Sequence, residues 1–212
     1  MAIKGTGRSP RGPYAKTAER RRQIAQAALE VFGARGYRGG TVQEVADRVG
    51  MSQTSVLHHF PTKAALLVAA LEHRDAIADE SPGTGDRFAE SVVRQAEHNE
   101  GAPGLIELYA VLCGESTTEG HPARTYFEER FERLRSEYAE ELRHLAEAGR
   151  LRPGVDPETA GTTLLALWDG IQVQWLFAPA EIDMAATLKA YLDLIMLPAP
   201  AAPAPAAPAD AP

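Results

Sequence analysis

Apolar residues recur every three to four positions along most of this chain, and breaks rich in glycine, proline or aspartate separate the stretches. That spacing places the apolar side chains on one side of an α-helix, whereas a half-buried strand would alternate apolar and polar residues. No strand pattern appears in the sequence. The 212 residues are therefore predicted to form an all-α protein of about nine helices.

Three short helices are predicted near the N-terminus. Thr17 is predicted to cap the first, which breaks at Gly33 and Gly36. Thr41 and Glu44 then form a capping box, in which each side chain binds the other residue's unpaired backbone amide, and a second helix follows to about Val49.

A third helix is predicted from residue 53 to about residue 60. Gly50 supplies the turn before it, Ser52 caps it, and Pro61 ends it and suits the first turn of a fourth helix. Two short helices joined by a tight turn are typical of a helix-turn-helix, whose second helix enters the major groove of DNA. A plain helical hairpin with a polar surface is the alternative interpretation. The side chains that face outward from the third helix are Ser52, Gln53, Thr54, Ser55, His58 and His59.

More helices are predicted after a loop over residues 81–86. Asp156, Pro157 and Glu158 combine three helix-start signals before the most apolar segment, which must be buried by more than one neighbour. Carboxylates and arginines alternate over residues 119–149, which indicates a solvated face. The predicted helices of this part cover 87–99, 104–116, 122–149, a segment opened by Asp156, and 183–197.

Four parts follow from these patterns. They are a flexible basic arm (1–16), a helix-turn-helix head (17–62), a helical body (63–197), and a disordered tail rich in proline and alanine (198–212).

Charge is divided unevenly between the two ends of the chain. Residues 1–63 carry a balance of +7 and the remainder −14, which sum to the overall −7. A basic head on an acidic body attracts phosphate at one end, although an ordinary charge gradient is the simpler alternative. The single cysteine excludes an internal disulfide, and no apolar run approaches the roughly 18 residues that span a bilayer. We expect a soluble, cytoplasmic protein.

Several segments together resemble the DNA-binding head of the TetR family of regulators. They are Phe32-Gly33-Ala34-Arg35-Gly36-Tyr37, Thr41-Val42-Gln43-Glu44-Val45-Ala46, Gly50-Met51-Ser52 and His58-His59-Phe60-Pro61-Thr62-Lys63, followed by Leu66. The resemblance covers residues 17 to about 66. It implies a three-helix head, a fourth connecting helix, and a ligand-binding body that dimerises through its last two helices.

The resemblance also implies roles for individual residues. Thr41 and Lys63 would hold phosphates, and the third helix would face the groove; two positions differ from frequent family residues, Leu57 from a tyrosine and Thr54 from a glycine. The predicted DNA-binding residues are Thr41, Ser52, Gln53, Thr54, Ser55, His58, His59 and Lys63, and the arm would add Arg8, Arg11 and Lys16.

Two further sets of residues are predicted in the body, and each has a plain packing role as its alternative. A ligand cavity would be lined by Tyr109, Cys113, Phe127, Trp168 and Gln172. A dimer interface would contain Gly170, Trp175, Leu188, Tyr191, Leu192 and Ile195. The acidic body makes an anionic effector the less favoured class.

The predicted function is a dimeric repressor that a small-molecule effector releases from an inverted-repeat operator in double-stranded DNA. A DNA-binding protein without an effector is one alternative. An enzyme is less favoured, because the sequence has no phosphate-cradling loop, nucleophile elbow or metal-ligand spacing. Neighbouring His58 and His59 diverge on a helix, and the other four histidines are interpreted as surface residues. No metal and no cofactor are predicted.

Overall fold

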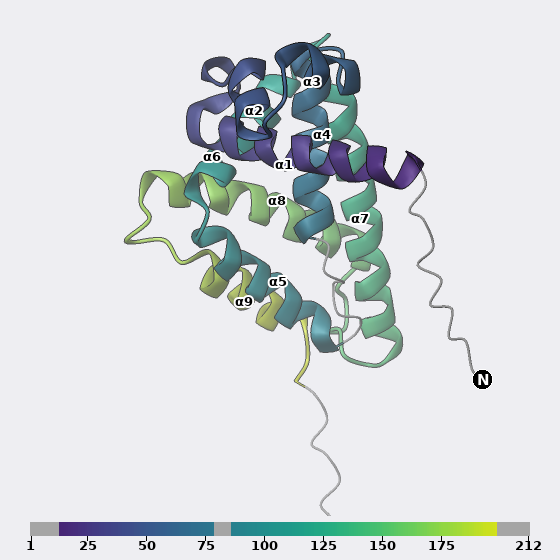
Figure 1. Cartoon of the computed structure of the whole chain (residues 1–212). Coiled ribbons are helices and arrows are strands. Elements are labelled where there is room, and N and C mark those ends of the chain that lie inside the picture. The colour runs from purple at the N-terminus through teal and green to yellow at the C-terminus, as the bar shows by residue number, and fades with distance from the viewer. Residues whose placement is uncertain (1–12, 79–85, 199–212) are drawn as a thin grey trace, which may run out of the picture.

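A computed structural model describes residues 13–78 and 86–198, and the described chain folds into nine α-helices, with no named strand (Figure 1). The all-α prediction is confirmed. The helices are α1 (Pro13–Gly39), α2 (Val42–Arg48), α3 (Gln53–His59), α4 (Lys63–Ala78), α5 (Asp86–Glu100), α6 (Pro103–Ser116), α7 (Arg124–Glu147), α8 (Pro157–Phe177) and α9 (Met184–Ile195).

The first helix starts earlier than predicted. Because α1 begins at Pro13, Thr17 lies inside it and is not its cap, and Lys16 belongs to this helix and not to an arm. Proline is favoured at a helix start, where its missing N–H costs nothing. Gly33 stays helical, and the break falls at Gly36, whose φ is 67°. Arg8, Arg11 and nearly all of the predicted tail lie outside the described residues.

The fourth helix starts later than predicted. It begins at Lys63, after Pro61, because the Thr62 hydroxyl accepts a hydrogen bond from the Ala65 amide (3.0 Å). Other start signals acted as expected. Asp156 caps α8 by accepting from the Thr159 amide (2.9 Å), and Asp183 caps α9 in the same way.

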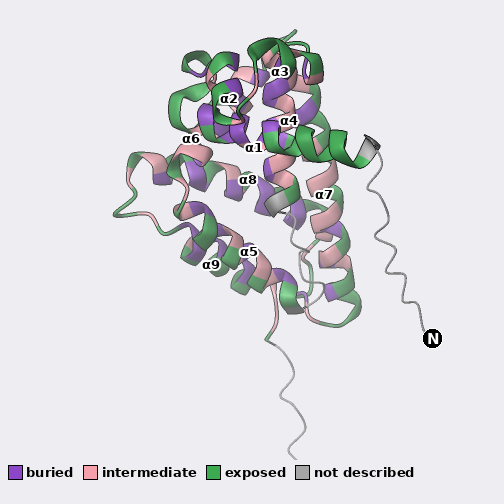
Figure 2. Cartoon of the chain, viewed as in Figure 1, coloured by how far each residue is buried: buried purple, intermediate pink, exposed green. Residues whose placement is uncertain are grey.

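The buried residues, which are purple in Figure 2, include two apolar clusters. One cluster joins the four helices α1, α2, α3 and α4, and it extends into α6 and α7 through residues such as Leu112 and Phe127. The other joins α5, α7, α8 and α9 around Phe88, Leu142 and Leu164. Helix α7 packs along α8, and α5 packs along α9. The head therefore shares part of its core with the body.

The chain after α7 returns to the end of α9. Leu151 and Met196 form an isolated antiparallel bridge, flanked by backbone hydrogen bonds from Arg152 to Ile195 (2.8 Å) and from Leu197 to Arg150 (2.7 Å). These bonds hold the last helix against the body. Within residues 13–78 and 86–198, none of the helices is both long and apolar enough to cross a bilayer.

Candidate functional site

Helices α2 and α3 form the predicted helix-turn-helix at one end of the molecule (Figure 1). Val45 and Val56 are fully buried and hold the two helices together. Between the helices, Gly50 has a φ of 65°, a left-handed backbone that glycine adopts without a steric penalty. The Met51 amide then closes the turn by donating to the Ala46 carbonyl (2.9 Å).

The predicted groove-facing side chains of α3 lie on its exposed face. Gln53, Thr54, Ser55 and His58 are exposed, and His59 is half-buried. Ser52 has a local role, because its hydroxyl accepts from the Ser55 amide (3.1 Å) and caps the helix. The exposed face of α3 is therefore polar and free of bulky apolar groups.

Two predicted phosphate-binding residues stand at the starts of the neighbouring helices. Thr41 and Glu44 form the expected capping box, in which Glu44 accepts from the Thr41 amide (2.9 Å) and Thr41 accepts from the Glu44 amide (3.2 Å). Lys63 is half-buried, with its ammonium 4.7 Å from the centre of the Tyr37 ring. Both residues are held in place by contacts within the head.

Arg21 of α1 also supports this surface, and the sequence did not single it out. Its guanidinium donates to the His59 carbonyl at the end of α3 and lies 4.1 Å from the centre of the Phe60 ring. Burial, with the nearby charges of His58, Arg21 and Arg20, lowers the pKa of His59 below its usual 6.5. His59 is therefore mostly neutral at neutral pH. Leu57, the position where many family members carry tyrosine, is half-buried against the head core.

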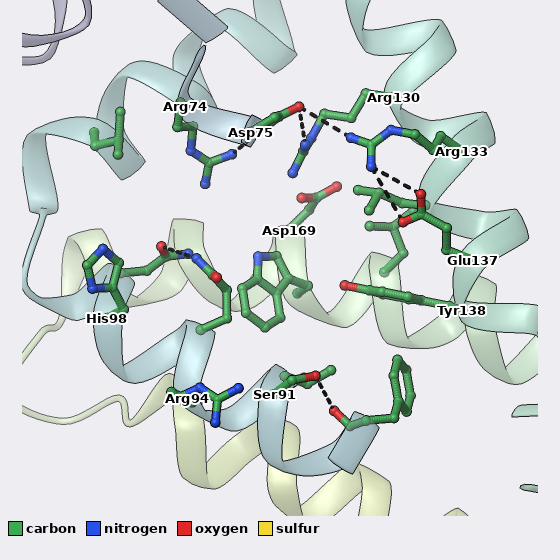
Figure 3. Close-up of a pocket in the computed structure, with 18 of the residues that line it drawn as sticks. Arg74, Asp75, Ser91, Arg94, His98, Arg130, Arg133, Glu137, Tyr138 and Asp169 are labelled. Atoms are coloured by element: carbon green, nitrogen blue, oxygen red, sulfur yellow. Dashed lines mark hydrogen bonds and ion pairs between the residues drawn. The ribbon is translucent and has the colours of Figure 1, made fainter. Parts of the chain in front are cut away.

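A cavity of about 430 Å³ lies in the body between α4, α5, α7 and α8, with one side chain each from α1 and α6 (Figure 3). Its apolar walls include Phe88, Leu165 and Trp168. Its size falls within the roughly 300–1,000 Å³ of typical small-ligand sites. Four arginines and three carboxylates also line it: Arg74, Arg94, Arg130, Arg133, Asp75, Glu137 and Asp169.

Asp75 of α4 is the centre of an ion cluster in this cavity. Its carboxylate lies 3.4 Å from Arg74, 2.5 Å from Arg130 and 3.5 Å from Arg133. It also accepts a hydrogen bond from the Tyr126 hydroxyl (2.9 Å). Because these partners except Arg74 lie on α7, the cluster ties the end of α4 to α7.

Two lining residues keep an unsatisfied polar atom. Oδ1 of Asp169 and Nδ2 of Asn99 are buried and have no hydrogen-bond partner among the described residues. Burial raises the pKa of Asp169 to about 6, against the lowering effects of Arg130, Arg74 and a hydrogen bond with Tyr109. The lining residues therefore include one donor and one acceptor that are unpaired.

One of the five predicted pocket residues lines this cavity. Trp168 lines the cavity, whereas Tyr109, Cys113, Phe127 and Gln172 do not. The Tyr109 ring packs on Phe127 in the core (5.3 Å between centroids), and its hydroxyl accepts a hydrogen bond from Arg130, which lines the cavity (3.2 Å). Gln172 is buried, and Cys113 is half-buried with its pKa raised to about 11, first by burial.

The sequence also missed the charged lining of this cavity. His98 lines the cavity as well, and it is exposed, as expected of a surface residue. Among the described residues, no group of three or more histidine, cysteine, aspartate or glutamate side chains is arranged to hold a metal ion.

The residues predicted at the dimer interface are mostly inside the body. Trp175, Leu188, Leu192 and Ile195 are buried in its core. Tyr191 is half-buried and donates to the Ala160 carbonyl (3.0 Å), so only Gly170 of the predicted set is exposed. The large apolar side chains that are exposed on α8 and α9 are Val173, Phe177 and Leu194. These side chains lie on the faces of α8 and α9 that point away from the core. Packing of the two helices against α5, α7 and each other leaves those faces uncovered.

Comparison with known proteins bears on both halves of the chain. The model of bacterial regulatory proteins of the TetR family matches residues 24–70, and the model of the C-terminal domain of BetI-type transcriptional repressors matches residues 84–197. A TetR transcription regulator from Haloarcula marismortui has the same fold, with a TM-score of 0.71 at 20% identity over 85% of this chain and 100% of that one.

Individual relatives match over different lengths. The regulator RutR of Escherichia coli K12 is 37% identical over 70 residues, which are 33% of this chain and only 31% of RutR. The repressor AcnR of Corynebacterium diphtheriae is 27% identical over 176 residues, which are 83% of this chain and 89% of AcnR. With both halves matched by models of the same kind of regulator, the chain belongs to the TetR family of bacterial transcriptional regulators.

Proposed function

We propose that this protein is a dimeric repressor that binds an inverted-repeat operator with α3 in the major groove and is released by a small-molecule effector. The observation that carries the proposal is the polar, exposed face of α3, formed by Gln53, Thr54, Ser55 and His58. Amide and hydroxyl groups of this kind bind base edges, and Gln can pair bidentately with adenine. Thr41, Lys63 and the exposed Arg20 and Arg22 would add contacts to phosphates.

Selection of bound duplexes from a random oligonucleotide pool, at near-physiological salt, tests the DNA-binding part. We expect enrichment of an inverted repeat whose half-sites are centred about 34–36 Å apart, one helical turn, or a multiple of that distance. If no sequence is enriched and all binding disappears as salt rises, the protein does not recognise sequence in its ligand-free form.

An apolar stripe on α8 and α9 supports dimerisation. On α8 the exposed residues Thr163, Ala166, Gly170, Val173 and Phe177 follow helical spacing, and on α9 Ala186, Ala190 and Leu194 do the same. Phe177 is 87% exposed and Leu194 is 71% exposed, which is unusual for such large apolar groups. A Cβ at Gly170 would meet nothing within 4 Å, so a partner helix has room to approach. Two copies of this stripe would form a four-helix bundle.

Charged substitutions in the stripe test this interface. Phe177→Glu combined with Leu194→Glu should convert a dimer to a monomer at micromolar concentration, measured by sedimentation velocity. Val111→Glu is the control, since Val111 is an equally apolar exposed residue on α6. A wild-type protein that is monomeric, or a double variant that stays dimeric, would rule out this interface.

Helix α4 supports the effector part of the proposal. Leu66 and Leu67, near its start, are buried in the head core, whereas Arg74 and Asp75, near its end, line the cavity. A ligand that binds more tightly to one arrangement of α4 than to another would therefore shift the position of the head. Such a shift in each subunit changes the spacing of the two recognition helices.

The N-terminal basic residues belong to the same proposal. Arg8 and Arg11 would extend contacts from the head to phosphates or the minor groove, and Lys16 would do so from the exposed start of α1. Deleting residues 1–12 should make the affinity for DNA less dependent on salt concentration. An unchanged dependence would remove Arg8 and Arg11 from the interface.

A further inference from the structure

We propose that the body cavity binds a small amphoteric molecule, with its anionic group against Arg94 and Asn99 of α5 and its amine against Asp169 of α8. The inference rests on the proposed function, in which this cavity is the effector site, and it names the chemical class of the effector.

The α5 wall of the cavity offers hydrogen-bond donors. Asn99 is only 3% exposed, and its Oδ1 already accepts from Nε2 of Gln95 (3.1 Å), so the amide orientation leaves Nδ2 without a partner among the described residues. Arg94 of α5 also lines the cavity; its side chain is exposed, and it has no ion pair among the described residues. Leaving a buried donor unpaired costs roughly 1–3 kcal/mol, which an acceptor on a ligand would recover. A guanidinium without an ion pair and an amide N–H without an acceptor are both donors that suit a carboxylate.

Asp169 offers the opposite chemistry on α8. Figure 3 shows Arg94 and His98 projecting from α5, whereas Asp169 comes from α8. One oxygen of the Asp169 carboxylate, Oδ1, is buried without a partner, while the carboxylate also has a hydrogen bond with Tyr109. A protonated amine would donate to Oδ1 and neutralise the buried charge.

The other charges of the cavity are already paired with each other. Asp75 holds Arg74, Arg130 and Arg133, and Glu137 accepts from Arg133 at 3.2 Å. Among the described lining residues, the charges without an ion pair are therefore one cation, Arg94, and one anion, Asp169. A purely anionic molecule would leave Asp169 unpaired, and a purely cationic one would leave Arg94 and Asn99 unpaired. An amphoteric molecule with an apolar middle against Phe88 and Trp168 satisfies all of them.

A fragment screen tests the proposal without DNA. The full-length protein is heated with equal numbers of amphoteric, anionic, cationic and neutral fragments of similar size, and the shift in Tm is measured. We expect the stabilising compounds to be concentrated in the amphoteric class. Concentration of the stabilising compounds in any other class, or the absence of an amphoteric binder, would overturn the proposal.

Variants then assign the two ends of each binder. Arg94→Gln and Asp169→Asn should each raise its Kd at least tenfold by calorimetry, and removing the amine from the compound should abolish the effect of Asp169→Asn. Arg135→Gln and Asp193→Asn are controls, because both residues are exposed and outside the cavity. Binding that neither cavity variant weakens would place the compound elsewhere and overturn the proposal. A binder that passes these tests but leaves DNA affinity unchanged would refute release by this ligand and leave the chemical assignment standing.

Discussion

Asp169 makes the ligand-free protein less stable at neutral pH. Its pKa is about 6 in the folded protein, above the usual 3.8, because burial disfavours the charged form. The folded state therefore binds a proton more readily than the unfolded state. The stability that protonated Asp169 contributes is complete below about pH 4 and is lost as pH rises through 6.

Replacement of Asp169 by asparagine tests this effect. Asp169→Asn should raise the free energy of unfolding by about 1–3 kcal/mol at pH 7.5, and by roughly half as much at pH 5, because less of the wild-type charge must then be buried. Urea denaturation at the two pH values measures the difference. The exposed Asp193→Asn should show no such pH dependence. A gain that is equal at both pH values, or a loss of stability, would contradict this role.

Gln53 and Lys63 should have different effects on DNA binding. Gln53→Ala should weaken binding to the selected duplex by about 1–3 kcal/mol and leave a scrambled duplex nearly unaffected, since base-edge contacts carry the sequence information. Lys63→Ala should weaken binding to both duplexes to a similar degree and reduce the salt dependence by about one counterion. Fluorescence anisotropy on both duplexes gives the comparison. An equal loss on both duplexes for Gln53→Ala would exclude base recognition by that residue.

Residues that act locally could be predicted from the sequence, and residues that act across the fold could not. The Thr41–Glu44 capping box and the Asp156 cap join atoms three residues apart. Asp75 meets Tyr126 and Arg133 across 51 and 58 residues of sequence. In the sequence, Asp75 and Arg133 look like any other charged residues on the solvated face of a helix. The ion cluster that they form could therefore be found only from the structure.

Helices α1 and α6 hold the head against the body by a close backbone contact. A Cβ at Gly104 of α6 would lie 2.6 Å from the Gly33 carbonyl oxygen of α1, which is closer than real Cβ atoms come. Glycine at position 104 is therefore required for this approach of the two helices.

Alanine at two glycines of α6 separates packing from helix propensity. Gly104→Ala should lower the free energy of unfolding by about 1–3 kcal/mol, the usual cost of an overpacked contact. Gly114→Ala is the matched control, because a Cβ there meets nothing within 4 Å, and it should be neutral or stabilising by up to about 1 kcal/mol. Thermal or urea denaturation gives both values. If the two substitutions change the free energy of unfolding equally, a side chain at position 104 does not disturb the packing of α6 against α1.

Helix identity was predictable along most of the chain, but the neighbours of each helix were not. The apolar character of α8 correctly predicted several packing partners, and it contacts α6, α7 and α9. Because α8 is apolar on several faces, the sequence could not show which of these faces stays uncovered. Trp175 is buried and Phe177, two residues later, is exposed, although both are large aromatic residues near one end of the helix.

Helix α4 connects the head to the body cavity. Its two ends contribute to the head core and to the charged cavity, so it is the element that both sites contact. Charge and motif predict a basic head and an acidic body. They could not predict the core that α1, α4, α6 and α7 share, because periodicity identifies an apolar face without saying which face it meets.

We propose that two heads, fixed in one dimer, recognise two half-sites at once. Binding to the selected inverted repeat should be compared with binding to the same repeat after insertion of five base pairs between the half-sites, which turns one half-site to the opposite side of the duplex. We expect two chains on the original duplex and a loss of affinity of at least tenfold on the lengthened one. Equal affinity for both duplexes would contradict simultaneous recognition by a fixed pair of heads.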